Sequence, residues 1–315
     1  MLDEKEIIRI FSNKLNITNL DDVALLEKGI VFKSDMLIAR TDVPWGMKAW
    51  QIARKSMVSC ISDLAAKGVR PYAAMISLGI PNDCSIQRTD IEGLAKGFAI
   101  ASKEFEVKIV GGDTNEACDL VIDCSIIGFT RFNVPTRKGA RPGDYVVVSG
   151  TFGFTAAGLA ILLKKAITDN NNNIFRKHAL KSVLEPYPRL SFGLSLARYF
   201  SSSIDSSDGL AVSLYELASQ SQDVDIRIDS IPIAEGMEKF AKDNSVDPYD
   251  LVFYGGEEYE IVATISSTRI RQAKKVARQA GVNLHIIGRV HKGSGKVFAR
   301  NKRLKNRGYM HFHKR

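Results

Sequence analysis

The run from residue 201 to residue 210, SSSIDSSDGL, places two carboxylates three residues apart among hydroxyl side chains and ends on a glycine and a leucine. Leu210, Leu214 and Leu217 then recur at helical spacing, which predicts a turn that leads into the N-terminus of a helix. Ser and Asp are common helix-capping residues, but a single Asp is enough for a cap. The second Asp and the cluster of Ser exceed what a cap requires.

Acidic turns recur elsewhere along the chain, each at the end of a predicted strand or beside a glycine. Asp63 is different, because apolar residues of a predicted helix surround it and a buried carboxylate needs a partner. Asp113 follows two glycines, which suit the close approach of the backbone to a ligand. The candidate carboxylates are Asp22, Asp42, Asp63, Asp113, Asp205 and Asp208, with Glu257 as a more distant member.

If these carboxylates converge, their mutual repulsion raises their pKa values or requires bound cations. Oxygen ligands without His or Cys favour Mg²⁺, which usually shares its coordination with the phosphates of a substrate. Such a site suits phosphoryl transfer, in which catalysis consists mainly of positioning and charge neutralisation. The alternative is a set of unrelated surface turns, which the composition alone does not reject.

The length of 315 residues suggests about two domains. No apolar run approaches the length of a membrane span, and the N-terminus does not resemble a signal peptide, so we expect a cytoplasmic protein with no membrane partner. The cysteines contain no C-x-x-C pair, which argues against a zinc or redox motif. Free, mostly buried thiols are favoured, and a disulfide stays open for Cys60, Cys84, Cys118 and Cys124.

The hydrophobic pattern of the first half follows the order strand, strand, helix, strand, helix, strand, strand, which predicts an α/β or α+β fold. We place a domain boundary near residue 138. The glycine turn at residues 150–153 matches neither glycine-rich nucleotide motif, so we expect a tight strand-to-helix connection there. Expected elements include strands at 30–32 and 36–39 joined by a turn at 33–35, a helix at 49–67 ended by Gly68, strands at 72–78, 107–110, 120–129, 145–149 and 261–265, and helices at 90–105, 155–165 and 268–280.

The formal net charge is +9, and the segment from Lys292 to Arg315 contains nine Lys and Arg but no acidic residue. Such a segment could bind nucleic acid or a phosphorylated small molecule, or it could be a solvated end. It lacks interleaved stacking aromatics and a recognised nucleic-acid motif, so nucleic acid is not expected to be a partner.

Six motifs occur in the order found in thiamine-monophosphate kinases, which belong to the superfamily of aminoimidazole-ribonucleotide synthetase. The chain resembles this family over nearly its whole length, and the ordered set is far more specific than any single motif. Segments 137–144 and 307–312 also look like those of the family. The six motifs are Asp21-Asp22, Thr41-Asp42, residues 62–68 (SDLAAKG), residues 111–114 (GGDT), residues 204–210 (IDSSDGL) and residues 255–260 (GGEEYE).

The resemblance implies ATP-dependent transfer of a phosphoryl group to thiamine monophosphate, with several Mg²⁺ ions. It also implies a homodimer whose N-terminal sheets pair, an ATP- and Mg²⁺-binding dimerisation domain at 1–138, and a C-terminal mixed-sheet α/β domain at 139–315, with ATP held between the domains. By motif, the metal ligands would be Asp22, Asp42, Asp63, Asp113 and Asp205, assisted by Thr41 and Asp208; the nucleotide positions would be Gly112, Asp113, Arg137 and Ser207; and the thiamine contacts would be Glu257 and Tyr309.

The implied nucleophile is a phosphate oxygen with a second pKa of about 6, already largely anionic at neutral pH, so no catalytic base is expected. The five histidines lie outside the acidic turns and are interpreted as surface or structural residues. The chain departs from the family pattern at Leu20, at Arg40 and in a shorter connection from Asp42 to Asp63. The alternatives are another ATP-using synthetase of the superfamily and a non-catalytic nucleotide- or RNA-binding module that uses the basic C-terminus.

Overall fold

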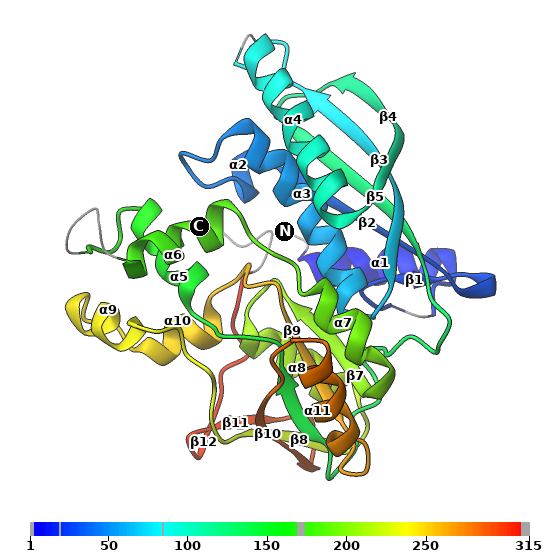
Figure 1. Ribbon diagram of the computed structural model, residues 1–315, viewed down its shortest axis with the longest axis vertical. Coiled ribbons are helices and arrows are strands. Elements are labelled where there is room, and N and C mark those ends of the chain that lie inside the picture. Colours follow the sequence, from blue (N-terminus) through cyan, green and yellow to red (C-terminus); the bar gives the residue numbers. More distant parts are fainter. Residues whose placement is uncertain (1–2, 19, 84, 169–173, 310–315) are drawn as a thin grey trace.

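The computed structural model describes all residues except 1–2, 19, 84, 169–173 and 310–315, and it contains two mixed sheets with helices packed against them (Figure 1). The first sheet has five strands in the order β1-β2-β5-β3-β4, and the second has seven in the order β12-β11-β8-β10-β6-β9-β7. Both sheets mix parallel and antiparallel pairs, which confirms the expected α/β class.

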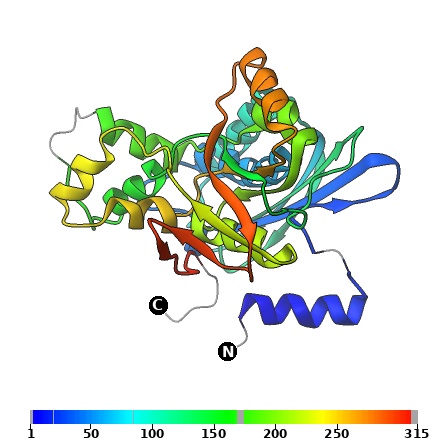
Figure 2. The same cartoon turned by 90° about the horizontal axis from the view of Figure 1, so that it is seen from below.

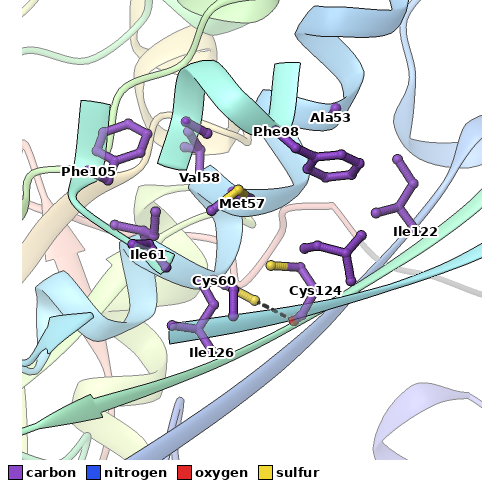
Figure 3. Packing of buried hydrophobic residues seen from close by; sticks show 14 of the residues in the cluster. Ala53, Met57, Val58, Cys60, Ile61, Phe98, Phe105, Ile122, Cys124 and Ile126 are labelled. Carbon is purple, nitrogen blue, oxygen red and sulfur yellow. Dashed lines mark hydrogen bonds between the residues drawn. The ribbon is translucent and has the colours of Figure 1, made fainter. Parts of the chain in front are cut away.

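The first sheet carries helices on one face only. Helices α3 and α4 pack on that face, and their buried side chains meet those of β5 (Figure 3). Two exposed residues of β3, Tyr72 and Met75, belong to the opposite face of the sheet. The elements are β1 (Ala24–Leu25), β2 (Ile30–Ile38), α2 (Ala39–Asp42), α3 (Ala49–Ala66), β3 (Arg70–Ile80), α4 (Arg88–Phe105), β4 (Lys108–Glu116) and β5 (Val121–Phe129), with a 3₁₀ turn at Glu27–Gly29.

Strand β2 is continuous, so the expected turn at residues 33–35 is wrong. The strand pairs with β5 along its whole length, from Ile30 opposite Phe129 to Ile38 opposite Val121. Its side chains alternate between the two faces, so Lys33 and Asp35 point inward with their apolar neighbours Val31 and Leu37. Charged residues in the middle of a strand suggest a turn, but here the interior supplies their partners.

The second sheet is covered on both faces. Helices α8 and α10 pack on one face, while α7 and α11 pack on the other. Its elements are β6 (Tyr145–Val148), α7 (Leu190–Leu196), β7 (Phe200–Ser206), α8 (Leu210–Gln220), β8 (Val224–Ile228), α10 (Pro248–Tyr254), β9 (Glu260–Ile265), α11 (Ile270–Gln279), β10 (His285–Lys292), β11 (Val297–Ala299) and β12 (Lys302–Arg303), with a 3₁₀ turn at Ala197–Tyr199.

Helix α3 connects the two halves of the molecule. Its last turn, with Ala65 and Ala66, is buried in the same apolar cluster as Phe192 and Leu196 of α7. Gly193 approaches this turn so closely that a Cβ on it would lie 1.7 Å from the carbonyl oxygen of Ala65. The helix ends as expected, with Gly68 at a positive φ of 66° after the last turn.

A separate apolar cluster joins α5 (Phe154–Leu162) and α9 (Met237–Asp243), and α6 (Ile174–Leu184) packs beside α5. Helix α1 (Glu4–Leu15) lies away from both sheets (Figure 2), and Phe11 on it is 61% exposed. Within the described ranges, no helix is both long enough and apolar enough to cross a membrane.

The described cysteines are free thiols. Cys60 and Cys124 are buried, and the Sγ of Cys60 donates a hydrogen bond to the carbonyl oxygen of Cys124 at 2.8 Å (Figure 3). Cys118 is exposed, and Cys84 lies outside the described residues. Burial raises the pKa of the Cys60 thiol, so this cysteine is an unreactive packing residue.

Candidate active site

Three of the predicted carboxylates meet at the junction between the two sheets. Asp63 comes from α3, Asp205 from β7, and Asp22 from the segment before β1, and all three side chains are buried. Ser62 Oγ donates a hydrogen bond to Oδ2 of Asp205 at 2.7 Å, so α3 contributes Asp63 to the group and also contacts Asp205 through the preceding residue. Residues more than 140 positions apart therefore share one polar interior.

The buried carboxylate of Asp63 has the partner that its position requires. Lys33 Nζ, from the inward face of β2, lies 2.6 Å from Oδ2 of Asp63. Burial nevertheless raises the pKa of Asp63 well above its usual range, against the attraction of Lys33, and repulsion from Asp205 and Asp22 raises it further.

The first acidic pair is held by a buried lysine. Lys67 is fully buried, and its Nζ lies 2.6 Å from Oδ1 of Asp21, 2.7 Å from Oδ2 of Asp22 and 2.7 Å from the carbonyl oxygen of Ser203. Arg137 adds a second cation, because its Nε donates to Oδ1 of Asp22 at 2.6 Å. Burial acts to raise the pKa of Asp22, but Lys67 and Arg137 outweigh it and leave the pKa below its usual value.

The pKa of Asp205 is raised by its buried position among the other acids. Burial and then repulsion from Asp22 raise its pKa to about 6, although the hydrogen bond from Ser62 opposes the change. A carboxylate with such a pKa is only partly ionised near pH 6. A cation that enters the site would favour its charged form.

A second group lies around Lys55, which precedes Asp63 in α3 by about two helical turns. Lys55 Nζ contacts Oε1 of Glu257 at 2.5 Å and the carbonyl oxygen of Asp42 at 2.6 Å. The Asp42 carboxylate accepts the backbone N–H of Ile38 at 2.8 Å, and Thr41 Oγ1 donates to the carbonyl of the same residue at 3.3 Å. The motif Thr41-Asp42 thus lies in the short helix α2, which the sequence did not predict.

Buried Tyr259 is electrostatically coupled to both groups. Burial raises the pKa of Tyr259 well above its usual value, and the negative charges of Glu257, Asp205 and Asp42 raise it further. The phenol is therefore a neutral hydroxyl at physiological pH.

The turn after β7 brings together the other predicted residues of the second domain. Gly209 follows Asp208 with a positive φ of 113°, which explains why glycine ends the motif. The backbone N–H of Glu257 donates to the carbonyl of Ser207 at 2.5 Å, and that of Tyr309 donates to the carbonyl of Asp208 at 3.0 Å. The segment beyond Tyr309 in the terminal motif lies outside the described residues.

Asp113 and Gly112 are the candidates that the structure does not bring to the group. They lie on β4, the edge strand of the first sheet, and both are exposed. A Cβ on Gly112 would lie 1.8 Å from the carbonyl oxygen of Ile76, so the close approach that requires glycine here is to the neighbouring strand. No hydrogen bond or ion pair joins Asp113 to the other acids within the described ranges, and the roles of Gly112 and Asp113 stay predictions.

The described residues contain no ready-made group of three or more His, Cys, Asp or Glu side chains that could hold a metal ion. Lysine and arginine neutralise the acids instead. The chemistry of the donors nevertheless fits Mg²⁺, because they are oxygens only. Oδ2 of Asp22 and Oγ of Ser206 are buried without a hydrogen bond of acceptable geometry, although Lys67 Nζ lies close to the former.

The glycine turn at residues 150–153 is a tight connection from β6 to α5, as expected, and a carboxylate occupies the position that a phosphate would take. Oε1 of Glu258 accepts the backbone N–H of Gly153 at 2.6 Å, and Oε2 accepts Thr155 Oγ1 at 3.2 Å, so the acid caps the N-terminus of α5. Burial raises the pKa of Glu258 to about 7, and repulsion from Glu260 contributes.

We expect Glu258→Gln to stabilise the protein at alkaline but not at acidic pH. The folded-state pKa of about 7 lies above the ordinary value of 4.5, so the acid favours folding below pH 4.5 and opposes it as the pH rises towards 7. Glutamine stays neutral, its amide oxygen can accept the N–H of Gly153, and its NH2 group can donate to Thr155 Oγ1. The gain in free energy of unfolding should reach at most about 3 kcal/mol at pH 8.

Urea unfolding at pH 4.5 and pH 8 measures this difference, with Glu238→Gln at an exposed position as the control. A gain for Glu258→Gln that is equal at the two pH values would contradict a titrating carboxyl at the end of α5.

The site also contains residues that the sequence motifs did not identify as functional, namely Lys33, Lys55, Lys67 and Tyr259. Lys67 lies four residues after Asp63. Lys33 points inward from β2, and a prediction of β2 as one continuous strand would have placed its side chain in the interior. The described histidines lie on other elements than the acids: His178 lies in α6, and His285 and His291 lie in β10.

The family of AIR synthase related proteins matches the chain with its N-terminal domain over residues 20–130 and its C-terminal domain over residues 141–300. The thiamine-monophosphate kinase of Nitrosopumilus maritimus is 41% identical and covers 99% of both chains. That of Pyrococcus horikoshii is 35% identical, over 96% of this chain and 92% of its own. A solved structure described as AaThiL complexed with AMPPCP and TMP superposes with a TM-score of 0.88 at 26% identity, covering 99% of this chain and 97% of that one.

Proposed function

The chain belongs to the thiamine-monophosphate kinases of the AIR synthase related family, and from that premise we propose that it transfers the γ-phosphoryl group of ATP to thiamine monophosphate. The observation that carries the proposal is the meeting of Asp22, Asp63 and Asp205 at the junction of the two sheets. These three residues lie in three of the six ordered motifs. Burying three carboxylates has a high energetic cost, which favours a functional role over a purely structural one.

The reaction forms a bond between a phosphate oxygen of thiamine monophosphate and the γ-phosphorus of ATP, and it breaks the bond from that phosphorus to the β–γ bridging oxygen. The products are thiamine diphosphate and ADP. The attacking oxygen is largely anionic at neutral pH, since the second pKa of a phosphomonoester is about 6, so none of the buried acids has to accept a proton.

The residues of the chain bind and orient the charged groups. Asp22, Asp63 and Asp205 would hold Mg²⁺, with Asp42, Thr41, Asp208 and Asp113 as further candidates. The bound ion would neutralise charge on the transferred phosphoryl group and fix its orientation. Arg137, 28% exposed at its side chain and paired with Asp22, supplies a fixed positive charge at the edge of the group. Gly112 and Ser207 are proposed nucleotide contacts, and Glu257 and Tyr309 are proposed contacts to thiamine.

We further propose that the protein works in the cytoplasm as a homodimer. The helix-free face of the first sheet supports the dimer, because it exposes a row of large apolar side chains, which are Phe32, Met36, Tyr72, Met75, Val110 and Phe129. Light scattering should give twice the chain mass of 34.8 kDa.

A phosphorylation assay tests the function directly. Purified protein with ATP, Mg²⁺ and thiamine monophosphate should produce ADP and thiamine diphosphate in equal amounts, as measured by chromatography. EDTA should abolish turnover and added Mg²⁺ should restore it. The buried Cys60 gives no support to a synthetase that depends on a reactive thiol. Folded protein that forms ADP only with another phosphate acceptor would contradict the proposal.

A further inference from the structure

The last part of the chain is strongly and uniformly basic. No Asp or Glu follows Glu260, while residues 261–315 contain fifteen Lys and Arg. The first 260 residues contain the remaining 29 basic and all 35 acidic residues, since 44 minus 15 is 29, which gives them a formal charge of −6. The positive charge of the molecule is therefore concentrated in α11 and in β10, β11 and β12 with their connections.

Strand register places some of these cations in one line with aromatic rings. Arg289 of β10 pairs with Tyr145 of β6 on one side and with Arg227 of β8 on the other. Arg227 pairs in turn with Phe298 of β11, and Phe298 pairs with Arg303 of β12. These five neighbouring strands thus present an arginine row, defined as Tyr145, Arg289, Arg227, Phe298 and Arg303.

The arginine row lies on an open part of the sheet. Residues on either side of Arg227 in β8 are buried against α8, so the alternation of the strand turns Arg227 to the opposite face. Arg227, Arg289 and Arg303 are exposed, and Tyr145 and Phe298 are partly exposed. With strands about 4.8 Å apart, five positions span about 19 Å.

The two central arginines are arranged in a way that does not favour stability. Arg227 and Arg289 lie directly opposite each other on adjacent strands, and like charges in such a pair are destabilising. Neither forms an ion pair with a described residue. Each guanidinium instead lies over a ring, Arg227 at 4.9 Å from the centroid of Phe298 and Arg289 at 4.2 Å from that of Tyr145.

Two acids, Asp225 and Asp229, lie two residues from Arg227, and the first of them is already engaged. Asp225 lies two residues before Arg227 on the same face, and its Oδ1 accepts the backbone N–H groups of Ser294 and Lys296, each at 2.8 Å. Helix α11 adds positive charge on the same side of the sheet, since its Ala273 and Ala277 pack there. A recess of about 450 Å³ on this helix is lined by Arg271, Lys274, Lys275, Arg278 and Gln279.

We propose that this face of the second sheet, centred on the arginine row, binds single-stranded nucleic acid. Arginines placed in one row with aromatic rings across an open sheet can contact phosphates, and bases can stack on the guanidinium planes that cover the rings. A duplex offers no free base faces for such stacking. An acidic membrane would favour exposed apolar side chains that insert, whereas the two rings here lie beneath guanidinium groups. The basic tail alone lacked interleaved aromatics, and the register of the sheet supplies Tyr145 from a distant segment.

The test measures binding of fluorescein-labelled 20-nucleotide oligouridine and oligothymidine by anisotropy between 50 and 200 mM NaCl. The parent protein should bind with an affinity that falls steeply with salt. Arg227→Gln/Arg289→Gln should weaken binding at least 10-fold and reduce the slope of log affinity against log salt by about 1.4, as expected for two lost phosphate contacts.

The matched control is Lys96→Gln/Lys103→Gln, which removes two exposed charges from α4 in the first half of the chain. It should leave binding within twofold of the parent. Equal weakening by both variants would show that binding depends on overall charge and not on the arginine row, which would overturn the proposal. Absence of binding by the parent at 50 mM NaCl would overturn it as well. Stronger retention on phosphatidylserine vesicles than on either oligomer would assign the face to membranes instead.

Kinase activity and thermal midpoint are measured on the same samples. Kinase activity should be unchanged in Arg227→Gln/Arg289→Gln, because the arginine row is separate from the acidic group, and the thermal midpoint should be equal or slightly higher, because two like charges that face each other are removed. The binding result is therefore independent of the proposed phosphoryl transfer, and either can fail without the other.

Discussion

Asp205→Asn is expected to lower kcat for phosphoryl transfer by at least about 1000-fold without destabilising the fold. Asparagine has nearly the same shape and can still accept the hydrogen bond from Ser62, which lies 2.7 Å from the carboxylate. It cannot supply the negative charge that a cation in the site requires. The pKa of about 6 shows that the charged form of Asp205 is costly in the folded protein, so removal of the charge should leave stability equal or slightly higher.

The readouts are steady-state kinetics and urea unfolding at pH 7.5. Asp119→Asn on the connection before β5 is a control, because the hydrogen bonds that Asp119 forms with described residues come from the backbone N–H groups of Arg40 and Leu120, outside the acidic group. Activity of Asp205→Asn within tenfold of the parent would remove Asp205 from the proposed metal ligands. Loss of activity together with loss of folding would instead assign the residue a structural role.

Lys67→Met is expected to cost about 3–5 kcal/mol of unfolding free energy, because it removes one partner of a buried charge cluster, takes the lysine partner from Asp21 and leaves Asp22 with Arg137 alone. The fully buried ammonium also anchors the carbonyl of Ser203, so the variant loses a contact between the two halves of the chain. Urea unfolding at neutral pH measures the loss.

Lys239→Met is the matched control, since its ion pair with Asp243 lies on the surface of α9 and should be worth less than about 1 kcal/mol. Adding Asp21→Asn to Lys67→Met should recover part of the stability by removing the carboxylate that has lost its lysine partner. Equal losses for the two lysine variants, or no recovery in the double variant, would contradict a cluster held by Lys67.

The elements and motifs differ in how far the sequence could predict them. Helix α3 and its end at Gly68 follow from periodicity and glycine placement, whereas a common site for Asp22, Asp63 and Asp205 was implied only by the resemblance to the family. Burial of Asp63 required a partner, but nothing local identified it. The partner is Lys33, whose charge made the middle of β2 look like a turn.

Asp113 shows a second limit. Two glycines before an acid fit both a ligand contact and a crowded strand, and only the register of β4 against β3 revealed that Gly112 is crowded by the backbone of Ile76. The arginine row shows a third, because Tyr145 and Phe298 are 153 positions apart in the sequence and only the order of the strands places them in one row. Information of this kind lies in long-range pairing, which short sequence patterns do not contain.

The tight fit of Gly193 against the last turn of α3 limits how substrates can enter. The carbonyl oxygen of Ala65 lies so close to Gly193 that α3 and α7 cannot slide past each other. The buried Ala65 and Ala66 hold the two halves of the molecule together at that point. A large hinge opening centred there would tear apart an apolar interface. We therefore expect substrates to enter without a change in the relative position of α3, which bears Asp63, and α7.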